Sequence, residues 1–145
     1  MINPSTDAFR AIALKAQTLV NAETAVVALA EADGDSVFYA AAVGRHASAI
    51  EGKRGAAATS GLCGAAFNSG QSELVCQTQG DLRVRQDLAE ALNITTALAV
   101  PVKHQGKLLG ALMVLNRTDG SAFDETAQAQ LETYADEVAV EISSA

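Results

Sequence analysis

Two apolar runs joined by a short polar connection form the strongest structural pattern in the sequence. The runs cover residues 95–102 and 107–116, and the connection is Lys103-His104-Gln105-Gly106. A polar connection of this length that ends in glycine is typical of a β-hairpin. Neither run alternates strictly between apolar and polar residues, so we expect central strands that are covered on both faces.

Two positions in this hairpin depart from an ordinary strand pattern. Pro101 has no backbone N–H to give to a sheet, which predicts a strand end or a bulge there. Gly110 and Ala111 leave a low spot in the second strand. Such a spot lets a ligand or an alanine-rich helix approach the sheet closely.

Amphipathic helices are predicted near both ends of the chain. Ser5 or Thr6 caps a first helix that extends to about residue 20, and Asp124 caps a last helix over residues 127–142. Apolar residues recur at three- and four-residue steps in both. The first stripe is Phe9, Ile12, Ala16, Leu19 and Val20, and the second is Leu131, Tyr134, Ala135, Val138 and Ile142.

Shorter elements fill the middle of the chain. Strands are predicted at 25–30 and 36–43 around a tight turn, and residues 44–60 form a long loop without periodicity. A short helix follows between Ser60 and Gly70, then a strand at 73–76 and a helix at 83–92. This order predicts one domain over residues 1–145 with an α+β fold. Its antiparallel sheet has five to six strands, the terminal helices on one face and a loop and short-helix cap on the other.

The charge balance argues against nucleic acid and membrane as partners. Seventeen acidic residues against ten basic ones give a net charge of −7, and the basic residues form no stripe. Such a field repels phosphate backbones and anionic lipid surfaces. The first residues lack the pattern of a signal peptide, and no apolar run is long enough to cross a bilayer, so we expect a cytoplasmic protein.

Candidate chemistry is limited to a few side chains. Cys63 is placed at the start of the short helix, where the helix dipole lowers the pKa of a thiol. Cys76 is the second cysteine, and the spacing of the two suggests neither a disulfide framework nor a zinc site. His46 and His104 both fall in polar loops without a second ligand nearby, so no metal site is expected.

Several strings, taken together, resemble the GAF domain, a sensory fold related to PAS. The strings are AVVALA, SGLCGAAFNSGQSELV, GDLRV, TTALAVPVKHQGKLLGALMVLNR and FDETAQAQLETYADEVAVEI, and together they span most of the chain. The resemblance implies a ligand pocket between the sheet and the cap. Its candidate apolar wall is Val37, Tyr39, Cys63, Phe67, Cys76, Leu82, Val84, Leu88, Leu92, Leu98, Val100 and Met113, and its polar candidates are Thr59, Ser60, Arg83, Arg85 and Thr96.

The resemblance also offers an enzymatic alternative. The GLCG string around Cys63 is similar to the free methionine-(R)-sulfoxide reductases, GAF-fold enzymes that use a nucleophilic and a resolving cysteine. The segment that carries the second thiol in that group is QTQGDLRVRQDLAEALN here, without a cysteine. Cys76, on the preceding strand, is the only possible second thiol.

Two ligand-binding subgroups match less well. Neither cysteine is followed by histidine, so no bilin attachment is expected. The cyclic-nucleotide subgroup is matched by Asn116-Arg117 and Phe123, but its acidic pair is misplaced, because Asp124-Glu125 follows Phe123 at once. We therefore expect Asn116 to be a turn residue and Phe123 to plug the space under the last helix, with cyclic-nucleotide binding as a further alternative.

The sequence favours a non-enzymatic GAF module in signal transduction that senses a small ligand or binds a protein partner. The terminal helical stripes predict a homodimer through residues 9–20 and 131–142. The thiol-dependent reductase remains the alternative of a different class.

Overall fold

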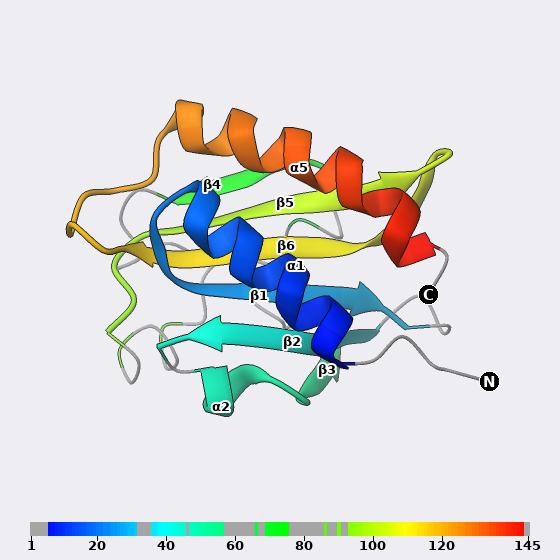
Figure 1. The fold of residues 1–145 in the computed structure, drawn as a ribbon, viewed down its shortest axis with the longest axis horizontal. Coiled ribbons are helices and arrows are strands. Elements are labelled where there is room, and N and C mark those ends of the chain that lie inside the picture. Colours follow the sequence, from blue (N-terminus) through cyan, green and yellow to red (C-terminus); the bar gives the residue numbers. More distant parts are fainter. Residues whose placement is uncertain are drawn as a thin grey trace.

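The computed structural model describes residues 6–31, 36–45, 47–56, 66, 69–75, 86, 90 and 93–143. Figure 1 shows the elements that it contains in these ranges. In chain order they are α1 (Thr6–Leu19), β1 (Ala22–Ala30), β2 (Ser36–Gly44), α2 (Ala47–Ile50), β3 (Arg54–Ala56), β4 (Glu73–Val75), β5 (Ala97–His104), β6 (Lys107–Arg117) and α5 (Glu125–Ser143).

The strands form one six-stranded sheet in the order β3-β2-β1-β6-β5-β4. Every pairing among these strands is antiparallel. Helices α1 and α5 lie on the same face of the sheet (Figure 1). The α+β class, the strand number and the placement of both terminal helices are therefore confirmed. The predicted cap is mostly outside the described residues.

The two helical stripes are buried against the sheet. On α1, Phe9 and Ile12 are each 6% exposed, and on α5 Leu131 is fully buried. Both stripes, apart from Leu19, which is 36% exposed, join one core cluster with sheet residues such as Leu112 and Val114. Asp124 caps α5 as expected, because its Oδ1 accepts a hydrogen bond from the Ala127 N–H at 2.9 Å.

The connection in the central hairpin is shorter than the sequence suggests. β5 continues to His104 and β6 begins at Lys107, so Gln105 and Gly106 alone form the turn. Their φ angles are +52° and +78°. Positive φ at both central residues is the geometry of a type I′ turn, whose twist suits a tight hairpin.

Pro101 lies inside β5, which corrects its expected place at a strand end or bulge. It pairs with Ala111 of β6, and the register shift falls one residue later, between Val102 and Lys103. β4 pairs with β5 only as far as Ala99. Pro101 is therefore tolerated where β5 has no described partner strand on its outer side.

The low spot at Gly110 is occupied by the backbone of the neighbouring strand. A Cβ atom at this position would lie 2.1 Å from the carbonyl oxygen of Ala28 in β1. Gly110 pairs with Leu29, close to a register shift at Val27/Ala28 in the pairing of β1 with β2. Glycine is needed at position 110 because two strands approach closely there, so the missing side chain is explained by strand packing.

The segment expected to be a structureless loop contains two short elements, α2 and β3. β3 extends the sheet beyond β2, and Tyr39 N–H donates to the Lys53 carbonyl at 2.9 Å just past that pairing. Elements of four and three residues are shorter than a useful period, so hydrophobic periodicity could not reveal them.

Further along, Gly70 has a φ of +67° and donates its N–H to the Ala66 carbonyl at 2.8 Å. This geometry is typical of the glycine that ends a helix, as the sequence predicts at this position. Most of the predicted short helix before it lies outside the described residues.

Candidate functional site

The face of the sheet opposite α1 and α5 has a floor of small apolar side chains. Ala28, Ala97, Ala99 and Ala111 are each at most 2% exposed. They belong to two clusters, one with Ala66, Val75 and Leu115 and the other with Val37. Because Ala66 lies between β3 and β4 and is fully buried, part of that connecting segment covers this face.

Tyr39 and Met113 stand beside this floor, and both are only partly buried. Met113 packs against both clusters, while Tyr39 packs against the cluster of Ala28, Val37 and Ala111. The structure thus brings together these two predicted wall residues. A floor of methyl groups with longer side chains at its margin is the kind of concave apolar surface that small-molecule sites use.

Leu98 and Val100 lie on the other face, which corrects their assignment to the pocket wall. Both are fully buried in the cluster that contains α1 and α5. Successive side chains of a strand point to opposite faces. On β5 the alanines at positions 97 and 99 therefore face the cap side, while Leu98 and Val100 face the helices.

The remaining predicted site residues lie outside the described residues. They are Cys63, Phe67, Cys76, Val84 and Leu88, together with Leu82, Leu92 and the polar candidates Thr59, Ser60, Arg83 and Arg85. Their assignment to the site stays a prediction from the resemblance.

Thr96 is the one polar candidate that the structure describes, and its hydroxyl is fully engaged within the protein. The residue is 2% exposed. Its Oγ1 donates to the carbonyl of Val75 at 2.9 Å and accepts the N–H of Phe123 at 3.1 Å. The hydroxyl thus connects the end of β4 to the residue just before Asp124, the cap of α5.

Asn116 organises the return of the chain from the cap segment into β5, a role that the sequence did not reveal. Its Oδ1 accepts the Thr95 N–H at 2.7 Å, and its Nδ2 donates to the Asn93 carbonyl at 2.9 Å and to Glu23 Oε1 at 3.1 Å. The residue is 8% exposed and lies within β6 with a φ of +58°. The expected turn after the strand is therefore wrong. The tolerance of asparagine for positive φ was the available signal.

A second buried threonine lies at the same end of the sheet. Thr24 is 1% exposed, and its hydroxyl donates to the carbonyl of Arg45. The Arg45 guanidinium approaches Glu23 Oε1 at 3.6 Å. These contacts join β1 to the end of β2.

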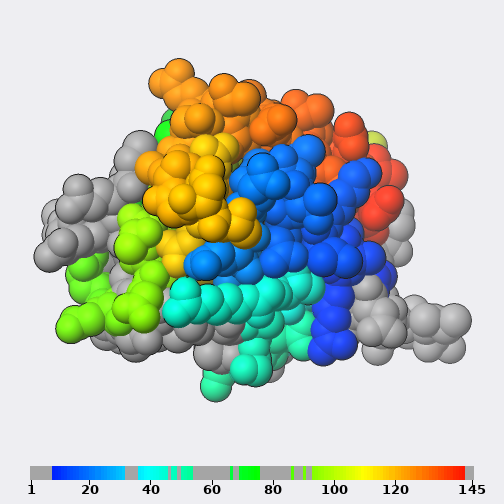
Figure 2. All heavy atoms as spheres, turned by 60° about the vertical axis from the view of Figure 1, so that its left-hand side comes forward, coloured from blue at the N-terminus to red at the C-terminus, as the bar shows by residue number. Residues whose placement is uncertain are grey.

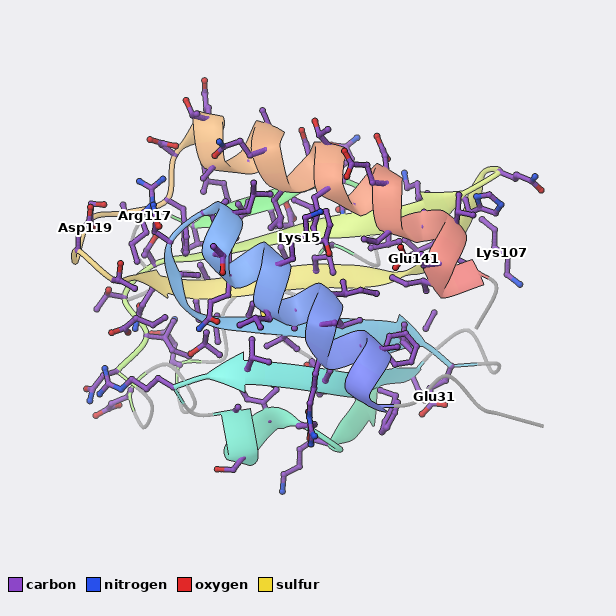
Figure 3. All side chains as sticks on the ribbon, in the orientation of Figure 1. Lys15, Glu31, Lys107, Arg117, Asp119 and Glu141 are labelled. Carbon is purple, nitrogen blue, oxygen red and sulfur yellow. The ribbon has the colours of Figure 1, made fainter. Side chains whose placement is uncertain are left out.

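Phe123 fills the space beneath α5 as expected, since it is 1% exposed in the main core cluster. The guanidinium of Arg117 lies 5.6 Å from the centre of its ring and donates to the Ala122 carbonyl at 3.2 Å. Arg117 and Asp119 lie at the end of the sheet where β6 runs toward α5 (Figure 3). The residues that partly match the cyclic-nucleotide subgroup thus have structural partners within this chain.

Figure 2 shows this end of the molecule, where segments distant in sequence adjoin. Residues 93–96, in yellow-green, lie beside the connection from β6 to α5, in yellow and orange. This is the end of the sheet at which the chain returns from the cap segment and leads into α5.

Among the described residues, no three histidine, cysteine, aspartate or glutamate side chains are placed to hold a metal ion. In the same residues, no helix is long and apolar enough to span a membrane. A shallow surface groove lies between α5 and the outer edge of β5, lined by polar groups that include Lys103, Glu132 and Asp136. This groove is separate from the alanine floor.

The six-stranded antiparallel sheet with α1 and α5 on one face defines a small α+β domain. The family model of the GAF domain matches residues 5–142, and the chain belongs to this family. A GAF domain is a regulatory or sensory module. No curated protein sequence matches this chain.

Solved structures share the fold at low sequence identity. A methyl-accepting chemotaxis protein fragment is 19% identical with a TM-score of 0.80, and 96% of this chain matches 88% of that one. The GAF domain of the Acinetobacter phosphoenolpyruvate-protein phosphotransferase is 16% identical with a TM-score of 0.79, and 96% of this chain matches 82% of that one. The free methionine-R-sulfoxide reductase of Neisseria meningitidis is 19% identical with a TM-score of 0.76, and the shares are 96% and 79%. At these identities the likeness concerns the fold alone.

Proposed function

We propose that this chain is a non-enzymatic sensory GAF module that binds a small molecule on the sheet face opposite α1 and α5. The observation that carries the proposal is the alanine floor with Tyr39 and Met113 at its margin. Its apolar character favours a ligand with an apolar body over a highly charged one. A protein partner is the other occupant that the sequence suggested.

The family context supports a sensory role. The similar structures include a methyl-accepting chemotaxis protein and a GAF domain of DevS from Mycobacterium smegmatis, which is 18% identical with a TM-score of 0.74. Domains of this fold thus occur in receptors as well as in enzymes. A regulatory module needs a ligand or partner contact but no catalytic group, and the described part of this site offers apolar surface.

The test is native mass spectrometry of protein purified from its own host. We expect a co-purified small molecule in the wild type and its loss in Met113→Trp, because the larger ring fills the space above the floor. Leu109→Trp is the matched control, since Leu109 is also on β6 and partly buried but packs against the helix-side cluster. Retention of the mass in Met113→Trp would contradict a site on this face, and no mass in the wild type would favour a protein partner.

The two alternatives have direct assays. The reductase reading predicts turnover of free methionine sulfoxide with thioredoxin or dithiothreitol, and loss of that turnover in Cys63→Ser. Cyclic-nucleotide binding predicts a thermal shift with cAMP or cGMP. The structural likeness to the Neisseria meningitidis reductase is the reason to run the first assay.

We further propose that the module works as a homodimer through its terminal helices, although the stripes named from the sequence are not its contact surface. Those stripes are mostly covered by the chain's own sheet. Among the described residues, the large apolar side chains left exposed are Leu14 and Leu19 on α1, 54% and 36% exposed, and Val140 on α5, 55% exposed. Light scattering at tens of micromolar protein should give a dimeric mass, and Leu14→Glu with Val140→Glu should give a monomeric one. A monomeric wild type would contradict the dimer.

A further inference from the structure

One buried hydroxyl group joins the end of β4 to the start of α5, in addition to the exposed hydrogen bond from Ser72 Oγ to Glu132 Oε2. Val75, the last residue of β4, packs in the same cluster as Ala97 and Ala99 of the floor. Its carbonyl accepts the hydrogen bond from Thr96 Oγ1. The chain leaves β4 at this point toward residues 76–92, which the sequence assigns to the cap.

The other side of the same hydroxyl faces the start of α5. Thr96 Oγ1 accepts the N–H of Phe123, whose ring is buried beneath that helix. Asp124, the next residue, caps α5. The two hydrogen bonds of Thr96 thus join the edge of the cap-side cluster to the first turn of the C-terminal helix.

We propose that the Thr96 hydroxyl couples the cap side of the sheet to α5, so that a shift of Val75 changes the stability of the first turn of that helix. The hydroxyl donates its single proton to the Val75 carbonyl, and this bond fixes the orientation of the oxygen. If Val75 moves away, the hydroxyl can rotate, and the hydrogen bond that its oxygen accepts from the Phe123 N–H weakens. Water does not replace either bond at a site that is 2% exposed. The inference rests on the proposed function in one respect: a ligand bound on the cap side is what would move Val75 in the working protein.

Coupling of this kind is reciprocal, which gives a test that needs no ligand. Asp124→Ala removes the cap of α5 at an exposed position and loosens the first helical turn. When Asp124→Ala is the only substitution, we expect amide hydrogen exchange at Leu74 and Val75 of β4 to be at least about twofold faster than in the wild type. Exchange at the fully buried Val27 reports global unfolding and is used to correct these rates.

Thr96→Val keeps the shape of the side chain and removes the hydroxyl, so the effect of Asp124→Ala on β4 should disappear in that background. Thr96→Ser keeps the hydroxyl and should retain the effect. Thr24→Val is the matched control, because it removes the hydroxyl of an equally buried threonine that bonds to Arg45 instead. The effect should persist there.

Two results would overturn the proposal. One is an equal effect of Asp124→Ala on β4 with and without the Thr96 hydroxyl. The other is its loss in Thr24→Val as well as in Thr96→Val, which would show a general loosening of this end of the sheet. Neither result bears on whether a small molecule co-purifies, so failure of the coupling and failure of the proposed ligand function are distinguishable.

Discussion

The two faces of the sheet differ in the size of the side chains that they present. Toward α1 and α5, β5 and β6 present Leu98, Val100, Leu112 and Val114, all fully buried. Toward the other side the same strands present Ala97, Ala99 and Ala111, together with the buried Leu115 and the partly buried Met113. On the first face, large side chains pack against the two long helices. Small ones keep the second face low, and part of the segment between β3 and β4 covers it at Ala66.

The largest expected effect is a difference in the free energy of unfolding between alanine substitutions at two adjacent residues of β6. Leu112→Ala opens a cavity in the helix-side core and should lower the free energy of unfolding by about 3 kcal/mol. Met113→Ala removes a partly exposed side chain from the other face and should lower it by only about 1 kcal/mol. Urea denaturation of both variants measures the difference, and equal losses would mean that the two faces are packed alike.

Enlarging an alanine on each face tests the same contrast in the opposite direction. Ala25 is fully buried in the helix-side cluster, so Ala25→Val should overpack it and lower the free energy of unfolding by about 2 kcal/mol. Ala111 is equally buried, but its neighbours Tyr39 and Met113 are only partly buried, so Ala111→Val should lower the free energy of unfolding by less than about 1 kcal/mol and reduce the amount of co-purified ligand. A larger loss at Ala111 than at Ala25 would show that the alanine floor has no room above it.

A smaller effect is expected at an ion pair near the β2 edge. The Arg10 guanidinium on α1 donates two hydrogen bonds to Glu51, whose Oε1 also accepts the Ala42 N–H at 3.1 Å. Arg10 holds the pKa of Glu51 below its ordinary value of 4.5, and the Ala42 N–H adds to this against the opposing effect of burial. The pair thus ties α1, on the helix side, to the residue that follows α2.

Because the pKa of Glu51 is lowered in the folded state, its contribution is present above pH 4.5 and is lost as the pH falls through the folded value. Glu51→Gln should lower the free energy of unfolding by less than about 1 kcal/mol at neutral pH. It should also flatten the fall in stability below pH 4.5. Denaturation curves at several pH values check this, and Arg10→Gln should give a similar profile. If stability below pH 4.5 fell as steeply in Glu51→Gln as in the wild type, Glu51 would not be the source of that fall.

The smallest effect at neutral pH concerns Tyr134 on the covered face. Burial raises the pKa of Tyr134 to about 12, and Glu141 and Glu137 add to the shift. The hydroxyl donates to the Ile12 carbonyl at 3.4 Å, and the Lys15 ammonium lies 5.2 Å from the ring centre. Lys15 lies between α1 and α5 in Figure 3.

The unfolded tyrosine ionises at pH 10, before the folded one, so stability should be unaffected by this group below pH 10 and fall between pH 10 and about 12. Tyr134→Phe should reduce that fall, while Tyr39→Phe, which leaves Tyr134 in place, should retain it. The free energy of unfolding measured across this pH range tests the prediction. Identical pH curves for the wild type and Tyr134→Phe would show that the two helices do not shield the Tyr134 ring from water.

The parts of the fold that the sequence predicted are those with a long, repeated pattern. The terminal helices and the central hairpin each extend over enough residues for their period to be recognised, and the cap at Asp124 has a local chemical signature. α2 and β3 are too short for any period, and the positive φ of Asn116 is accompanied by hydrogen bonds to two other segments, residues 93–95 and β1.

The candidate site was harder to predict because alternation along a strand separates two sets of residues without saying which face each set occupies. Leu98 and Val100 were correctly grouped by their shared parity, and the structure then places that group under the helices. Tyr39 and Met113 come together on the cap side. The cysteines and the other predicted wall residues lie outside the described residues, so their place in the site stays a prediction.

Pro101 also bears on how the molecule avoids aggregation. Among the described strands, β5 extends beyond the last residue that β4 pairs with, and an unpaired strand edge is a template for pairing with another chain. On that stretch Pro101 has no N–H to offer an incoming strand, and the exposed Lys103 adds a charge that would have to be neutralised. The proline that interrupts the hairpin pattern thus lowers the capacity of this stretch of β5 to pair with another strand.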